Sequence, residues 1–236
     1  MEVEELEQEV GDRDPTFLRT RVVVRYDHRS LEDPTASSNR LRLRFLYAFG
    51  PKQRFAISTL EPVVQTETPL RTARGSGDAE VQFNANIVNR ERFRSGVAIQ
   101  TTLQTASDAL LGGATTTLKP SLDVAAVLSS RTELIAALYY KRSIHTSRGV
   151  PFAQWEPDVI MNVRVLEATW FLEWDSYYDV RPGLFAQTLK PGISRALGSR
   201  WVVSAYYAVG VNADARRSQY RHDAGLDVTW YPRKHR

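Results

Sequence analysis

The chain has 236 residues, 42% of them hydrophobic, and its 31 lysines and arginines outnumber its 27 acids to give a net charge of +4. The basic residues are scattered, whereas nucleic-acid-binding proteins gather them in one patch or tract. No stretch approaches the roughly 20 apolar residues that a membrane helix needs, because charges, prolines or glycines interrupt every apolar run. These properties exclude a helical membrane protein and argue against a nucleic-acid partner. The absence of cysteine fits an oxidising envelope compartment.

Residues 1–15 are acidic, and Gly11 and Pro15 end any short helix that forms there. We interpret this segment as an N-terminal leader or a small plug, with a disordered tail as the alternative. It lacks the basic and then apolar profile of a secretory signal, so we expect that a signal was removed.

From Phe17 onward the pattern changes to a period of two residues, which is typical of strands with one apolar face. In 41–49, apolar residues such as Phe45 alternate with a face that carries Arg42 and Arg44. In 79–88, apolar residues alternate with a face that is entirely polar.

The same alternation returns over 155–165, 168–179, 201–212 and 220–231, where aromatic residues cluster near the strand ends as interface girdles do. Weaker segments lie at 18–26, 55–64, 93–104, 118–128, 132–144 and 187–196. Together they make about twelve strands of roughly ten residues, the length that crosses a bilayer when tilted.

The connections alternate between short and long. Short ones lie at 50–53, 89–92, 129–131, 166–167 and 197–200, and long ones at 28–40, 65–77, 105–117, 145–153, 180–186 and 213–219. Bacterial outer-membrane barrels have short periplasmic turns and longer external loops, whereas a soluble all-β protein has no reason to alternate them.

The sequence therefore predicts an all-β fold, a transmembrane antiparallel up-and-down β-barrel over residues 16–232. We expect it in the outer membrane of a Gram-negative bacterium, surrounded by outer-membrane lipids and with both termini in the periplasm. The basic tail, residues 233–236, is interpreted as a solvated end.

Gly77-Asp78 lies at a predicted strand start, and the stretch from Val97 to Ser107 is followed by Gly112-Gly113. These motifs, with 171–178 and 189–193, resemble the outer-membrane transporter family named for the meta-pathway of phenol degradation. Gln104 and Ala106 replace the Pro and Gly of that family's Pro-Thr-Gly turn. The resemblance covers about residues 41–230 through short turn motifs. It implies passive uptake of small, hydrophobic or aromatic compounds.

If the polar face of each strand points inward, arginines come from the first two strands and acids mainly from later ones. The predicted lumen-lining residues are Arg19, Arg21, Arg25, Arg42, Arg44, Glu80, Gln82, Asn84, Asn86, Asp123, Glu156, Asp158, Asn162, Arg164, Glu173, Asp175, Asp223 and Asp227. A cationic wall facing an anionic one would orient polar solutes in a water-filled pore. The predicted function is passage of small solutes through this polar lumen.

Closure of the barrel places the last strand beside the first. We therefore expect Asp223 and Asp227 to neutralise Arg19 or Arg21 directly.

Two alternatives stay open. In the first, the charges pair with one another and fill a packed structural barrel that transports nothing. In the second, the barrel is an outer-membrane lipid hydrolase, which needs a nucleophile, a histidine base and an orienting group on its rim. Asp27-His28-Arg29-Ser30 places His28 and Ser30 two residues apart near a strand end. We predict that the chain is not an enzyme and has no catalytic residue.

The remaining histidines are His145 in a predicted outer loop, His222 on the lipid side near a strand end and His235 in the tail. None clusters with another histidine in the way that a metal site requires. Gly112-Gly113 is expected to form only a flexible loop, because no phosphate-binding fingerprint surrounds it. We predict no metal and no cofactor.

Overall fold

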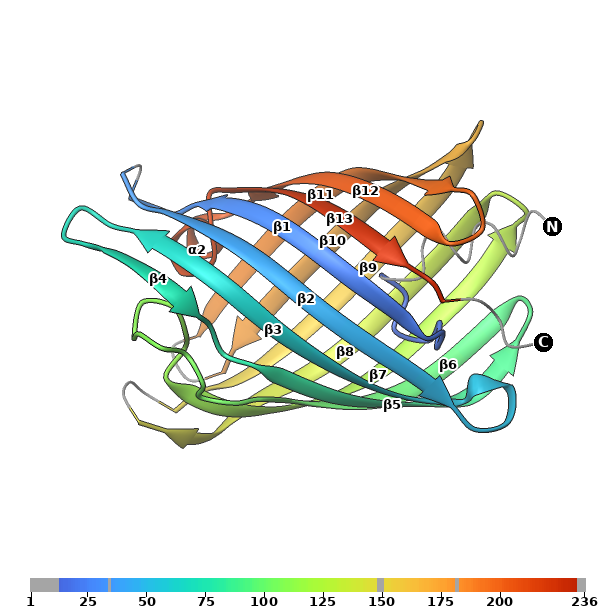
Figure 1. The fold of residues 1–236 in the computed structure, drawn as a ribbon, viewed down its shortest axis with the longest axis horizontal. Helices are drawn as coiled ribbons and strands as arrows, with labels where there is room; N and C mark the ends of the chain where they lie inside the picture. The colour runs from blue at the N-terminus through green and yellow to red at the C-terminus, as the bar shows by residue number, and fades with distance from the viewer. Residues whose placement is uncertain (1–12, 34, 148–150, 181–182, 233–236) are drawn as a thin grey trace.

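The computed structural model describes residues 13–33, 35–147, 151–180 and 183–232 (Figure 1). Most of these residues lie in one antiparallel sheet. Its strands are β1 (Arg21–Ser30), β2 (Ser37–Phe49), β3 (Phe55–Glu67), β4 (Thr72–Ser76), β5 (Glu80–Arg90), β6 (Phe93–Thr102), β7 (Thr115–Ser129), β8 (Thr132–Thr146), β9 (Ala153–Val165), β10 (Ala168–Asp179), β11 (Leu184–Leu197), β12 (Trp201–Gly210) and β13 (His222–Trp230). A 3₁₀ turn η1 (Pro51–Gln53) and a short helix α2 (Ala213–Ser218) complete the elements. None of the described helices is long and apolar enough to cross a membrane.

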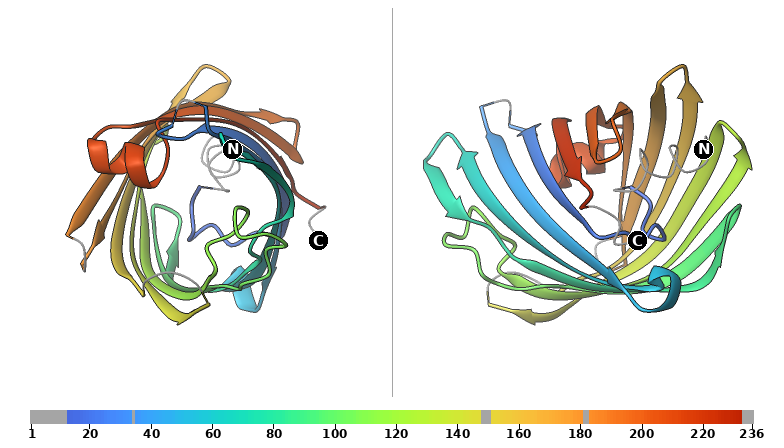
Figure 2. Two further views of the ribbon diagram at one scale, coloured as in Figure 1. Left: turned by 90° about the vertical axis from the view of Figure 1, so that its left-hand side faces the viewer. Right: turned by 45° about the vertical axis from the view of Figure 1, so that its right-hand side comes forward.

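The sheet closes on itself, because β1 pairs with both β2 and β13 and β2 pairs in turn with β3. β3 pairs with β4 over Val63–Glu67 and with β5 over Phe55–Leu60. β4 and β5 thus share one position in the wall, and the thirteen strands form a ring of twelve. Figure 2 shows this ring end-on, with the segment before β1 and the loop after β6 lying inside it.

Each of the twelve predicted strand segments overlaps a strand of the structure, and β10 has the predicted bounds. Besides the turn η1 in the short connection 50–53, two elements were not predicted, and both fall in segments interpreted as long loops. β4 lies within 65–77, where Pro69, Gly75 and Gly77 give the sequence a turn-rich composition. α2 is too short to show a helical period, and its start is fixed locally by the Asn212 side chain, which accepts a hydrogen bond from the Ala215 N–H at 3.0 Å.

The faces of the strands follow the predicted phase. Phe45 and Phe83 point outward and are 51% and 41% exposed, whereas the inward Asn84 is 3% exposed. An apolar outside around a polar inside is the arrangement of a membrane barrel and the reverse of a soluble one. Trp201 and Trp230 pack with ring centroids 6.3 Å apart at the end with the short turns, as an interface girdle would.

Candidate lumen site

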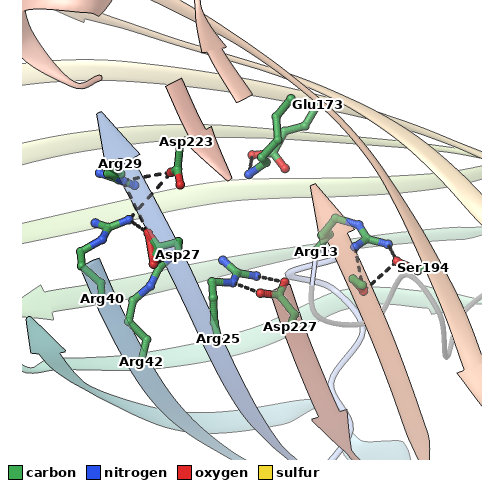
Figure 3. A network of polar contacts seen from close by, with 12 residues as sticks. Arg13, Arg25, Asp27, Arg29, Arg40, Arg42, Glu173, Ser194, Asp223 and Asp227 are labelled. Carbon is green, nitrogen blue, oxygen red and sulfur yellow. Dashed lines mark hydrogen bonds and ion pairs between the residues drawn. The ribbon is translucent and has the colours of Figure 1, made fainter. Parts of the chain in front are cut away.

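A cluster of arginines and aspartates, the seam network, joins the inner faces of β1, β2 and β13. Asp27 is fully buried and forms ion pairs with Arg29, Arg40 and Arg42, with Asp27 Oδ2 3.2 Å from Arg42 Nη2 (Figure 3). Asp223 accepts a hydrogen bond from Arg29 Nε at 2.9 Å. The seam network therefore compensates the buried Asp27 with several cations.

The predicted partners of Asp223 and Asp227 were wrong. Asp227 is held by Arg25, with Nε and Nη2 donating at 2.5 and 2.7 Å, and Asp223 by Arg29 and Arg40. The register explains the difference, since Arg25 lies opposite Asp227 and Arg29 opposite Asp223. Arg21 donates instead to the backbone carbonyl of Phe17 at 2.8 Å.

Acidic side chains gather on β9 and β10, which lie across the ring from β2 in the strand order. Asp158 and Asp175 are direct neighbours in the β9–β10 register. Glu156 forms an ion pair with Lys119 of β7, and Glu173 forms one with Lys190 of β11. The cationic and anionic walls expected from the sequence thus lie on opposite sides of the interior, with two lysines moderating the anionic one.

Residues 13–20, the inner segment, pass through the interior before β1 begins. Asp14 is 1% exposed and accepts from Arg94 Nη2 at 2.7 Å, and the same nitrogen donates to Glu133 at 2.6 Å. Asn86 Nδ2 donates to the carbonyl of Thr16 at 2.8 Å. These contacts fix one side of the inner segment to β5, β6 and β8.

Arg13 reaches the other side of the ring. Its Nη2 donates to the Ser194 hydroxyl at 2.6 Å (Figure 3). Its guanidinium stacks 3.8 Å from the Phe171 ring centroid. The inner segment therefore spans the interior from β6 and β8 to β10 and β11, which narrows the lumen.

The loop 103–114, the inner loop, narrows the opposite end. Leu110 and Leu111 pack with the inward Val64 and Ala73 of β3 and β4. Asp78 holds the inner loop with three hydrogen bonds, accepting from the backbone N–H groups of Thr105 and Ala106 at 3.1 Å each and of Gly113 at 2.7 Å.

The expectation that Gly112-Gly113 is only a flexible loop was wrong. A side chain on Gly112 would lie 2.5 Å from Asp78 Oδ2, closer than real contacts allow, so this position requires glycine. Gly112 therefore lets the backbone pass close to the Asp78 carboxylate.

A polar cavity of about 300 Å³ remains between the inner segment and the two walls. Its lining includes Arg25 and Arg44 from the cationic wall, Asp158 and Glu173 from the anionic wall, and Arg13 and Pro15 from the inner segment.

The predicted lumen residues that lie in strands all share the inward phase of burial. Arg19 differs, because it precedes β1 and lies in the inner segment, with its guanidinium 5.4 Å from the Phe17 ring centroid. Seven charged residues with structural roles in the interior were missed: Asp27, Arg29, Arg40, Arg94, Lys119, Glu133 and Lys190. Their signal was the alternation itself, since Asp27 and Arg29 continue the phase of Arg25 beyond the end of the predicted strand segment 18–26.

The outward face carries a second polar group near the long-loop end of β1. His28 Nδ1 lies 2.9 Å from Asn39 Oδ1, and the Tyr26 hydroxyl donates to the same oxygen at 2.9 Å. Ser30 is two residues from His28 on the same face of β1 and lies opposite His222 in the β1–β13 register. The Ser30 hydroxyl is buried and has no hydrogen-bond partner among the described residues.

The other two described histidines, His145 and His222, lie near strand ends. His222 is on the outward face, with Nδ1 2.7 Å from the Tyr207 hydroxyl, and His145 is exposed near the end of β8. His235 lies outside the described residues. In the part of the chain that the structure describes, no three acidic, histidine or cysteine side chains are placed to hold a metal ion.

Tyr220, which lies outside the strands, has a buried phenol next to an arginine. Tyr220 lies between α2 and β13, with the Arg29 guanidinium 5.0 Å from its ring centroid. Burial raises the pKa of Tyr220 to about 12, so its phenol stays neutral beside the seam network.

No family model and no curated protein matches the sequence. Solved structures do share its architecture. The COG4313 outer membrane channel from Pseudomonas putida F1 has a TM-score of 0.72 and 12% identity over 89% of this chain and 94% of that one. The NanC porin has a TM-score of 0.64 and 11% identity over 90% of this chain and all of that one (100%). A KdgM porin in complex with disordered oligogalacturonate has a TM-score of 0.57 and 12% identity over 89% of this chain and 99% of that one.

This chain has the fold of outer-membrane β-barrel channels. At these identities the likeness shows the fold alone, and the phenol-degradation family that the turn motifs resemble is not shown.

Proposed function

We propose that this chain is an outer-membrane channel for the passive passage of small solutes through its polar interior, with both termini in the periplasm. The observation that carries the proposal is the charged cavity inside a closed barrel with an apolar outer face. The charged lining favours polar solutes. The hydrophobic or aromatic solutes that the family resemblance implies gain no support from it.

The inner segment is proposed as the element that limits this passage. It crosses the interior and is fixed on both sides, so solutes must pass beside it or displace it. This role extends the leader-or-plug interpretation of residues 1–15 to residue 20. Residues 1–12 lie outside the described part of the chain.

Single-channel conductance and reversal potential in planar bilayers test the channel. We expect a small conductance for the parent and a larger one after deletion of residues 1–20, with folding of both checked by gel shift. Arg44→Ser should shift ion preference toward cations, because it removes a positive charge from the cavity wall. Arg44 is a sharper choice than Arg42, since Arg42 also holds the buried Asp27. No conductance from either chain contradicts the proposal and favours a packed structural barrel.

The second candidate function is lipid hydrolysis at the outward face of β1 and β2. The supporting observation is the His28–Asn39 hydrogen bond at 2.9 Å, because an amide oxygen that accepts from Nδ1 orients the other ring nitrogen for use as a base. Ser30 supplies a hydroxyl on the same face. This site lies near the long-loop end of the barrel wall, where a lipid headgroup would meet it.

Fatty-acid release from phospholipid in detergent micelles tests this candidate. If it is right, Ser30→Ala and His28→Ala each lower the rate by at least about 1,000-fold, as in other serine hydrolases. His222→Ala is the matched control, because it removes a neighbouring histidine that is not one of the proposed catalytic residues Ser30, His28 and Asn39. Activity that is absent, or that survives Ser30→Ala, rules out hydrolysis at this site.

A further inference from the structure

Two charged side chains that line the cavity, Arg44 and Asp158, form no ion pair with a described residue. Arg44 of β2 has no hydrogen bond or ion pair with any described residue, and it lies on the cationic wall. Asp158 of β9 lies on the anionic wall, and its Oδ1 atom is buried without a hydrogen-bond partner among the described residues.

Several other strand-borne charges near these two are already compensated, whereas Asp175, the register neighbour of Asp158, forms no ion pair with a described residue. Arg25 holds Asp227 with two hydrogen bonds, Lys119 holds Glu156 and Lys190 holds Glu173. A solute entering the cavity therefore meets a positive pole at Arg44 and a negative pole at Asp158 and its neighbour Asp175, with compensated ion pairs around them.

An ionised group held away from bulk water without a partner is costly, and an opposite charge within a few ångströms relieves the cost. An anion lowers this cost only at Arg44 and is repelled by Asp158. A cation lowers it only at Asp158 and is repelled by Arg44. A solute with a carboxylate at one end and an ammonium at the other relieves both at once.

The size of the cavity sets the scale of the solute. Its volume of about 300 Å³ is at the lower end of ligand pockets. This fits a molecule between a single amino acid and a dipeptide in size.

We infer that the cavity is a binding site for small zwitterions, which dock with their carboxylate on Arg44 and their ammonium on Asp158. The inference rests on the proposed channel function and names its solute class. Compounds such as ω-amino acids match it, because their two charges are separated by a flexible apolar chain.

Calorimetric titration of the full chain in detergent tests this with three probes of equal length: 6-aminohexanoate, hexanoate and hexylammonium. We expect 6-aminohexanoate to bind at least 10-fold more tightly than either singly charged probe. Arg44→Gln should reduce its affinity to that of hexylammonium, and Asp158→Asn combined with Asp175→Asn should reduce it to that of hexanoate. Arg195→Gln is the control, since Arg195 is an exposed arginine that pairs with Glu167 outside the cavity.

Three outcomes overturn the inference: hexanoate binding as tightly as 6-aminohexanoate, hexylammonium doing so, or no probe binding saturably. The first two would make the cavity an anion or a cation site. Conductance of the same preparation separates this failure from failure of the channel, because ions can pass through a pore that has no zwitterion site.

Discussion

Phe83 and Gln82 are neighbours on β5 that face different surroundings. Phe83 is 41% exposed on the outer face, whereas Gln82 lines the cavity. Because an arginine on the lipid face costs roughly 2 to 4 kcal/mol at the bilayer midplane, Phe83→Arg should strongly reduce folding into liposomes while Gln82→Arg should not. Folding yield by gel shift measures both. Equal yields would show that the assigned faces are wrong.

The polar neighbour on the other side, Asn84, is a poorer control than its sequence suggests. Its side chain is 3% exposed, and Nδ2 donates to the carbonyl of Pro15 at 3.4 Å, so an arginine there would displace the inner segment. Alternation predicts the direction in which the Asn84 side chain points. It does not predict that the inner segment, which is distant in sequence, already occupies the space next to that side chain.

Among the elements, the inner loop depends most on one side chain. Asp78→Ala removes three hydrogen bonds to backbone N–H groups, which at about 1 kcal/mol each amounts to roughly 2 to 4 kcal/mol. We expect the loop to leave the interior, so that added protease cuts within 103–114 of the folded barrel and conductance rises. Glu67→Ala is a control on an exposed carboxylate. Unchanged cleavage would show that the packing of Leu110 and Leu111 holds the loop without Asp78.

The strands were predictable because the alternation within each strand shows which side chains face outward and which face inward. In β5, for example, the apolar Val81 and Phe83 alternate with the polar Gln82 and Asn84. The partners of the charges were not. That Asp227 meets Arg25 rather than Arg21 depends on the β1–β13 register, which alternation alone leaves undetermined. The His28–Asn39 contact depends on the β1–β2 register in the same way. The path of the inner segment depends on contacts with strands remote in sequence, for which no local pattern exists.

The whole molecule is expected to behave as a barrel that requires an amphiphile. Its outer face is apolar, so the folded chain should be stable in detergent, give a β-type circular dichroism spectrum and migrate differently on a gel with and without boiling. The reason is that a closed sheet leaves no edge from which the detergent can begin unfolding. A chain that stays monomeric, folded and β-rich without detergent would contradict this.

The seam network also bears on how such a chain assembles. Arg25 and Asp227 lie 202 positions apart, so the bond between them can form only when the last strand reaches the first. Joining the ends of so long a loop carries a large entropic cost and makes this pairing a late event. A slip by one residue at that moment would turn Asp223 and Asp227 toward the lipid, where ionised groups are strongly disfavoured. The aspartates of β13 thus favour one register of the closing strands over registers shifted by one residue.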